Sequence, residues 1–142
     1  MILKLFSDGG SRGNPGPGAS AVLIFTEDDK LCDFSGSYFP VTTNNNAEYQ
    51  ALMIGIKLVV KKYSGQLNAI ELECYLDSEL VVKQMRGEYK VTDANIKNLK
   101  AQIDPYLTGF QDVRFIHIPR EQNKLADRLV NLILDTKLSN DL

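Results

Sequence analysis

Residues 8–18 read Asp-Gly-Gly-Ser-Arg-Gly-Asn-Pro-Gly-Pro-Gly and stand between two runs of strand-forming residues. Five glycines and two prolines in residues 9–18 predict a loop, because both residue types favour turns. The flanking runs and the one that follows them predict strands at residues 2–7, 19–26 and 31–38. We therefore expect an antiparallel meander, with Asp8 just past the end of its first strand.

Beyond residue 43 the apolar residues change to helical spacing and predict a helix over residues 44–63. Its apolar face carries Ala51, Leu52, Ile56 and Val59. Thr43 or Asn44 can cap its start, because each offers a side-chain oxygen to free backbone N–H groups. Further strands are expected at 69–76 and 112–118, and further helices at 78–86, 93–107 and 122–135. Because strand and helix alternate there, the later strands should be parallel.

The sequence thus predicts an α/β fold in a single domain of residues 1–142. Its five-stranded mixed sheet has three antiparallel strands first and helices on both faces. The length of 142 residues, with 44% hydrophobic and 24% charged, suits a globular domain. No apolar run approaches the ~20 residues of a membrane span. The first residues read as a strand rather than a leader, so we expect a cytoplasmic protein.

The cysteine content and the net charge exclude few classes of function. Cys32 and Cys74 lack CxxC spacing and are interpreted as small buried residues rather than a disulfide or metal site. The net charge of −2 is unusual for a nucleic-acid binder. Setting four acids aside as metal ligands leaves 14 acids against 16 bases. Binding to a polyanion would have to come from local patches and would be sensitive to salt.

Four acids lie at the ends of the expected elements. Asp8 and Asp77 each follow a predicted strand. If these two strands are parallel neighbours, both end at the same edge of the sheet, which is where open α/β sheets bind their ligands. Glu48 is expected in the first turn of the helix that begins near residue 44, and Asp127 early in the last helix. Converging carboxylates need a cation, and oxygen ligands alone favour Mg²⁺ or Mn²⁺ over zinc. Each acid taken alone could equally be a cap or a surface residue.

The sequence around each acid decides between these readings, because four segments resemble the signature motifs of type 1 ribonucleases H. In chain order they are Asp8-Gly9-Gly10-Ser11-Arg12-Gly13-Asn14-Pro15-Gly16-Pro17-Gly18, Thr42-Thr43-Asn44-Asn45-Asn46-Ala47-Glu48, Leu76-Asp77-Ser78-Glu79-Leu80-Val81 and Pro119-Arg120-Glu121-Gln122-Asn123-Lys124-Leu125-Ala126-Asp127. All four occur in the family's order and span nearly the whole chain. The resemblance implies a ribonuclease H-like fold.

The resemblance also implies an activity. Asp8, Glu48, Asp77 and Asp127 would be the catalytic, metal-binding residues for two Mg²⁺ ions, with Mn²⁺ as a substitute. Asp8 would bridge both ions, and Asp127 would be the most peripheral ligand. The family hydrolyses the RNA strand of RNA–DNA hybrids and leaves 3′-hydroxyl and 5′-phosphate ends. Two alternatives stay open: a nuclease of this fold that also cleaves duplex RNA, and a catalytically silent nucleic-acid-binding module.

Substrate contacts are expected from residues beside the acids, namely Gly9, Gly10, Ser11, Arg12, Asn14, Thr43, Asn44, Asn45 and Arg120. Glycine lets the backbone approach a ligand closely, and asparagine amides can read 2′-hydroxyl groups. Asn14 and Asn44 could also serve as a turn residue and a helix cap. Thr43 is a candidate contact for a phosphate of the DNA strand.

The chain departs from the family pattern in two respects. Only Glu88–Thr92 joins the helices at 78–86 and 93–107, so the basic extra helix of many members is missing, and we expect no separate hybrid-binding domain. Binding of a hybrid would then rely on basic residues of these two helices and their connection, namely Lys83, Arg86, Lys90, Lys97 and Lys100. His117 falls in a strand, so we expect Arg120 to occupy the loop where the family often carries histidine. We expect a monomer without an obligate protein partner.

Overall fold

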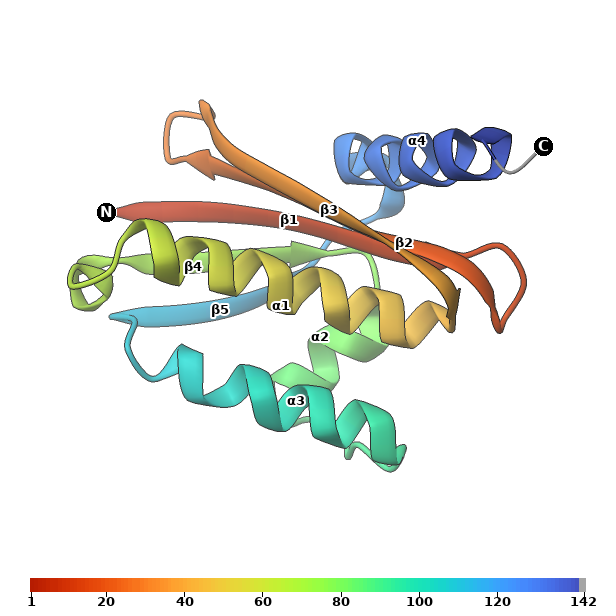
Figure 1. The fold of residues 1–142 in the computed structure, drawn as a ribbon. Helices are drawn as coiled ribbons and strands as arrows, with labels where there is room; N and C mark the ends of the chain where they lie inside the picture. Colours follow the sequence, from red (N-terminus) through yellow and green to blue (C-terminus); the bar gives the residue numbers. More distant parts are fainter. Residues whose placement is uncertain (141–142) are drawn as a thin grey trace.

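The computed structural model describes residues 1–140 and contains a five-stranded sheet in the order β3-β2-β1-β4-β5 (Figure 1). The strands are β1 (Ile2–Ser11), β2 (Gly16–Thr26), β3 (Leu31–Thr42), β4 (Glu71–Leu76) and β5 (Asp112–His117). The first three pair antiparallel, whereas β4 is parallel to both β1 and β5. The predicted mixed sheet is confirmed.

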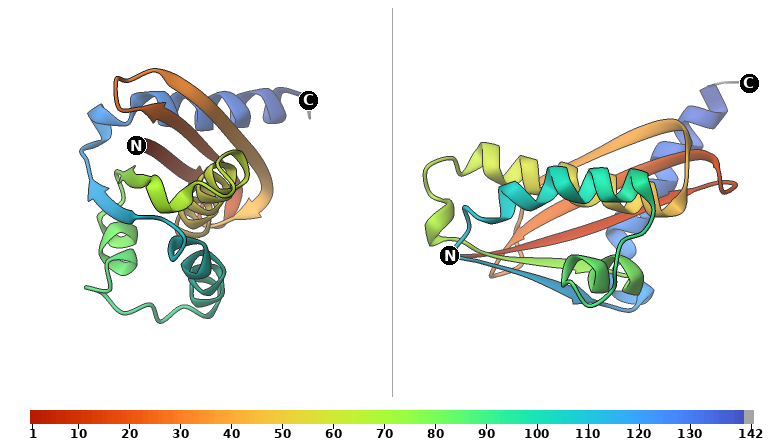
Figure 2. Two further views of the ribbon diagram at one scale, coloured as in Figure 1. Left: turned by 90° about the vertical axis from the view of Figure 1, so that its left-hand side faces the viewer. Right: turned by 90° about the horizontal axis from the view of Figure 1, so that it is seen from below.

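Helices cover both faces of this sheet, as predicted (Figure 2). They are α1 (Asn44–Lys62), α2 (Glu79–Met85), α3 (Ala94–Leu107) and α4 (Lys124–Asn140), with short 3-10 turns at Leu67–Ala69 and Arg120–Gln122. The main core lies under α1 and includes Cys74, whereas a smaller cluster joins α4 to β2. Both cysteines are free. None of the helices in residues 1–140 combines the length and the apolar character needed to span a bilayer.

β1 corrects the prediction that a loop begins at residue 9. The strand runs through Asp8, which is paired with Ala21, and continues to the pair Ser11–Gly18. The connecting loop is therefore only residues 12–15. Local composition favoured a turn, but pairing with β2 outweighs the entropy cost of ordering glycine. Parallel pairing between β1 and β4 stops at Phe6 and Tyr75, so Asp8 still emerges beside the end of β4.

The helix starts also differ in detail from the expectation. Thr43 is the N-cap of α1 and accepts a hydrogen bond of 3.2 Å from the Asn46 backbone N–H, which decides between the two candidate caps. The helix α1 begins at Asn44, as predicted, but Glu48 is its fifth residue and therefore lies just beyond the first turn, in which it was expected. The last helix begins at Lys124 because the residues before it form a 3-10 turn, and Asp127 lies in its first turn.

Gly9 sets how closely α1 approaches the sheet. A Cβ atom at this position would lie 2.3 Å from the backbone carbonyl carbon of Ala47, well inside van der Waals contact. The Ser20 hydroxyl donates a 2.6 Å hydrogen bond to the same Ala47 carbonyl oxygen. The helix backbone therefore rests directly on β1 and β2. This contact brings Glu48, the next residue of α1, to the edge where Asp8 lies.

Candidate active site

Three carboxylates from three separate elements meet at this edge of the sheet. Asp8 comes from β1, Glu48 from α1 and Asp77 from the residue that follows β4. One oxygen of each carboxylate lies within 4.8 Å of an oxygen of the other two. Asp8 and Glu48 are buried, with 7% and 8% of their surface exposed, and Asp77 is half-buried.

Burial and mutual repulsion make this cluster hard to charge. Burial, together with the charges of Asp77 and Asp127, raises the pKa of Asp8 from 3.8 to about 7. The pKa of Glu48 is also raised, first by burial and then by the charge of Asp8. Burial raises the pKa of Asp77, although Arg120 acts in the opposite direction. Without a cation the cluster therefore holds protons near neutral pH.

The donor set fits a hard divalent cation. Its ligands are carboxylate oxygens only, which suits Mg²⁺ or Mn²⁺ and not a soft metal. The Glu48 Oε2 atom is buried and has no hydrogen-bond partner within the described residues. A buried carboxylate oxygen without a partner is costly, and a bound cation would satisfy it. Asp8, Glu48 and Asp77 are thus the residues that could hold a metal.

Asp127 lies in the same cavity but outside the closest cluster. The cavity has a volume of about 410 Å³. Its lining includes the four acids together with Gly9, Gly10, Ser11, Arg12, Asn44, Asn45 and Arg120. The charge of Asp127 raises the pKa of Asp8, so the two carboxylates interact without belonging to one tight set. The structure therefore gathers most residues expected from the sequence into one open site.

Four further residues of this cavity were missed by the sequence analysis. They are Ser78, Val130, Asn131 and Leu134. The last three follow Asp127 at spacings of three, four and seven residues, which is the periodicity of one helix face. This signal was present in the sequence. It was overlooked because the apolar members of the face looked like ordinary core residues.

The asparagines around the cavity brace the loop of residues 12–15. Asn14 Oδ1 accepts a 3.0 Å hydrogen bond from the Asn44 backbone N–H. Asn44 Oδ1 in turn accepts 2.9 Å and 3.2 Å hydrogen bonds from the N–H and hydroxyl groups of Ser11. Arg12 pairs with Asp135 on α4 at 2.6 Å. The side-chain carbonyl oxygens of Asn14 and Asn44 are thus engaged in hydrogen bonds within the protein. The side-chain amide N–H groups of the two asparagines are therefore left to contact a substrate.

Asn14 and Thr43 lie in an adjoining cavity rather than beside the four acids. This second cavity, of about 610 Å³, lies between the loop, the start of α1 and the start of α3. Asn44 and Asn45 line both cavities and connect them. A ligand long enough to fill both would pass over the N-terminus of α1.

The basic residues expected to grip a substrate are partly engaged within the protein. Lys83 pairs with Glu79 at 2.8 Å, and Lys100 pairs with Asp104 at 2.9 Å. Arg86 donates a 2.8 Å hydrogen bond to the Phe115 carbonyl. Three of the five therefore already have partners within the protein.

His117 is the last residue of β5, and its side chain is exposed. It is paired with Leu76, so it lies beside Asp77, and its charge lowers the pKa of Asp77. The lining of the acidic cavity includes Arg120 but not His117. The expectation that His117 is a strand residue is confirmed.

We predict that His117→Ala retains most of the activity of this site, because this histidine acts on Asp77 only through its charge. Turnover on the RNA–DNA hybrid that the sequence resemblance implies as substrate should stay within about tenfold of the unmutated protein, since one modest pKa effect is worth about 1.4 kcal/mol or less. Steady-state kinetics at several pH values would measure this. A loss of two or more orders of magnitude in turnover would contradict the prediction.

Comparison with known proteins agrees with this geometry. A family model described as "Reverse transcriptase-like" matches residues 6–133. The protein named Ribonuclease HI of Halobacterium salinarum is 34% identical over 130 residues, which cover 92% of this chain and 63% of that one. The structure of LC11-RNase H1 in complex with RNA/DNA hybrid superposes with a TM-score of 0.90 at 39% identity, covering 96% of this chain and 99% of that one. The chain belongs to the type 1 ribonuclease H family.

Some relatives of this ribonuclease H chain are much longer. The Bifunctional protein Rv2228c of Mycobacterium tuberculosis is 37% identical over 136 residues, which cover 95% of this chain but only 36% of that protein. The chain thus spans about a third of the mycobacterial relative and under two thirds of the halobacterial one.

Proposed function

We propose that the protein is a metal-dependent endoribonuclease that hydrolyses the RNA strand of RNA–DNA hybrids and leaves 3′-hydroxyl and 5′-phosphate ends. The observation that carries this proposal is the convergence of Asp8, Glu48 and Asp77 within 4.8 Å on a ribonuclease H fold. A structural relative is described in complex with an RNA/DNA hybrid, which supports this substrate.

The four acids have different roles in this proposal. Asp8, Glu48 and Asp77 would hold divalent cations, and Asp127 would be a more peripheral ligand. A pair of bound Mg²⁺ ions would supply an activated water and charge stabilisation for an in-line displacement at phosphorus. Arg120 lies in the same cavity, and because a guanidinium group offers only hydrogen-bond donors, it contacts a phosphate oxygen and does not act as a general base.

The residues at the start of α1 distinguish the two strands of the hybrid. The amide N–H groups of Asn14 and Asn44 donate to 2′-hydroxyl oxygens, because their carbonyl oxygens are already used within the protein. Gly10 lets the backbone of β1 come close to the RNA strand. Thr43, at the N-terminus of α1 and in the adjoining cavity, contacts a phosphate of the DNA strand.

A panel of matched substrates tests this proposal. The protein is incubated with Mg²⁺ or Mn²⁺ and a labelled RNA–DNA hybrid, duplex RNA, duplex DNA or single-stranded RNA, with Asp8→Asn as control. We expect metal-dependent cleavage of the RNA strand of the hybrid. Comparable cleavage of duplex RNA would favour the broader nuclease. Hybrid binding without any cleavage would favour the silent binding module and overturn the proposal.

Asp127→Asn should be less damaging than removal of any of the three clustered acids. Asp127 lies outside the set of oxygens within 4.8 Å, so its loss leaves the main metal ligands in place. We expect turnover to fall by about ten- to a hundredfold, with the smaller loss in Mn²⁺. Parallel titrations of Mg²⁺ and Mn²⁺ against activity would measure this. A loss as large as that of Asp77→Asn in both metals would contradict the prediction.

A further inference from the structure

A second surface of the molecule lies on the outer side of α4, away from the carboxylates. Four large apolar side chains are unusually exposed there: Leu31 at 50%, Phe34 at 60%, Leu125 at 56% and Leu132 at 61%. All four line one shallow hollow of about 290 Å³ between α4 and the β2–β3 hairpin. A contiguous apolar patch of this kind on a soluble protein marks an interaction site.

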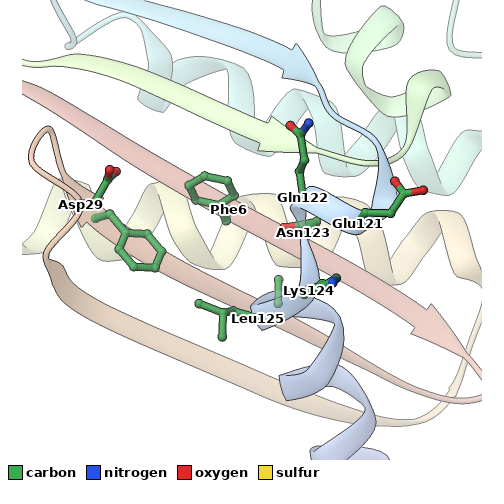
Figure 3. Close-up of a pocket in the computed structure, with 9 residues that line it drawn as sticks. Phe6, Asp29, Glu121, Gln122, Asn123, Lys124 and Leu125 are labelled. Carbon is green, nitrogen blue, oxygen red and sulfur yellow. The ribbon is translucent and has the colours of Figure 1, made fainter.

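An apolar pocket of about 260 Å³ adjoins this hollow, and Leu125 lines both (Figure 3). Its floor is aromatic: the Phe6 ring stacks on Tyr75 at 4.7 Å and meets Phe25 edge-on at 5.6 Å. Figure 3 shows Leu125 across the pocket from Phe6, with the Glu121 carboxylate directed away from it. The surface thus offers two adjacent recesses for apolar side chains.

The charge at the hollow favours a negatively charged occupant, because the charged residue in its lining is Arg128. Neither Arg128 nor Lys124 has an ion-pair partner within residues 1–140. The adjoining pocket carries Lys124 and Glu121, and the Glu121 carboxylate points away from it. By contrast, Asp29 at the rim of the pocket is already paired with Lys4 at 3.0 Å. A twofold contact centred on Leu125 would bring like charges together, which disfavours a second copy of the chain.

We propose that the outer face of α4 and the β2–β3 hairpin form a docking surface for an amphipathic helix that carries carboxylates beside its apolar side chains. Leu125, Leu129 and Leu132 span two turns of α4, about 10 Å. A docked helix presents apolar side chains at i, i+4 and i+7 over the same length. Five of the seven residues that line the hollow are leucines, whose side chains do not stack on bases, so the hollow suits a protein segment better than a nucleic acid.

Such a partner would leave the catalytic cavity open. Asp127, Val130 and Asn131 line the carboxylate cavity from one side of α4, whereas Leu125 and Leu132 lie on its other side. One helix therefore separates the two surfaces. The docked segment could hold the enzyme on a larger assembly while the hybrid occupies the cavity.

Charge reversal on both partners provides the test. The probes are a fluorescein-labelled helical peptide with leucines at i, i+4 and i+7 beside glutamates, and its matched copy with lysines in place of the glutamates. Fluorescence anisotropy should show that Arg128→Glu weakens binding of the glutamate peptide about tenfold and strengthens binding of the lysine peptide. Leu132→Ser should weaken binding of both, and the exposed Leu80→Ser on α2 is the matched control.

Hybrid hydrolysis by Arg128→Glu should stay within about twofold of the unmutated protein, because Arg128 faces away from the cavity. Three results would overturn the proposal. The first is equal affinity of both peptides for every variant, or no binding of either. The second is single-stranded DNA that competes with the peptide for this surface. The third is a dimer in sedimentation that Leu132→Ser dissociates.

Discussion

Asp8→Asn should lower turnover on an RNA–DNA hybrid at least about a thousandfold. Asp8 belongs to the set of carboxylate oxygens within 4.8 Å of one another, and the charges of both Asp77 and Asp127 raise its pKa. In the proposed mechanism, its loss would remove one of the three clustered ligands of the divalent cations. Several kcal/mol of transition-state stabilisation would go with it, and 1.36 kcal/mol corresponds to a tenfold change in rate. Single-turnover cleavage of a labelled hybrid would measure the loss.

The matched control is Asp135→Asn, because this acid lies on α4 and pairs with Arg12 rather than with the cluster. It should keep activity within about threefold of the unmutated protein, since an exposed ion pair contributes little. Full activity of Asp8→Asn would refute the metal-site assignment outright.

The same substitution should stabilise the metal-free protein. The Asp8 carboxyl ionises at about pH 7 in the folded state but near its ordinary pKa of 3.8 when unfolded. Folded protein therefore binds more protons between these values, and its stability falls as pH rises from about 4 to 7. Asp8→Asn removes this penalty, so its advantage should be near zero at pH 4 and roughly 4 kcal/mol above pH 7. Urea unfolding in EDTA at pH 4 and pH 8 would measure both.

Asp8→Asn should thus lower the activity of the protein and at the same time raise the stability of its metal-free form. Saturating Mg²⁺ should reduce the stability advantage of Asp8→Asn over the unmutated protein at pH 8. The reason is that the cation stabilises only the unmutated folded protein. If Asp8→Asn were less stable than the unmutated protein at pH 8 in EDTA, the cluster would not be electrostatically strained, and the argument from repulsion would be wrong.

Gly9→Ala should have the largest effect on the fold. The added methyl group would lie 2.3 Å from the Ala47 carbonyl carbon and 2.6 Å from the Glu48 nitrogen, so no side-chain rotation can relieve the clash. Either α1 moves away from β1 or the fold is lost. We expect a loss of about 3 kcal/mol, at the upper end for overpacking. A shift of α1 also moves Glu48, so activity should fall more than the remaining folded fraction explains.

Gly10→Ala is the matched control for this prediction. A Cβ atom there meets only Asn44 Oδ1, at 3.8 Å, which is ordinary contact. Its free energy of unfolding should change by less than about 1 kcal/mol. Equal stability of the two variants in thermal unfolding would show that the close approach of α1 is not a constraint on residue 9.

The identity of the acids and the order of elements could be predicted from the sequence, because both depend on local patterns. Alternation and turn residues marked the strands, and the helical period marked α1. Each acid stood inside a motif, such as Asn123 before Asp127, that is weak alone, and the four motifs in the family's order together identified the set. The sheet topology followed because strand–helix–strand connections have few solutions.

The tertiary structure alone decided how these parts act together. Pairing with β2 turned the glycine-rich run after Asp8 into strand, which local propensity cannot reveal because it depends on a partner in space. Contact between Gly9 and Ala47 set the position of Glu48, and burial by distant elements raised the pKa of Asp8. The apolar surface around Leu125 was equally invisible, since exposure is a property of packing. Thus residue identity and order came from local sequence, whereas distance, burial and charge coupling came from contacts between segments far apart in the chain.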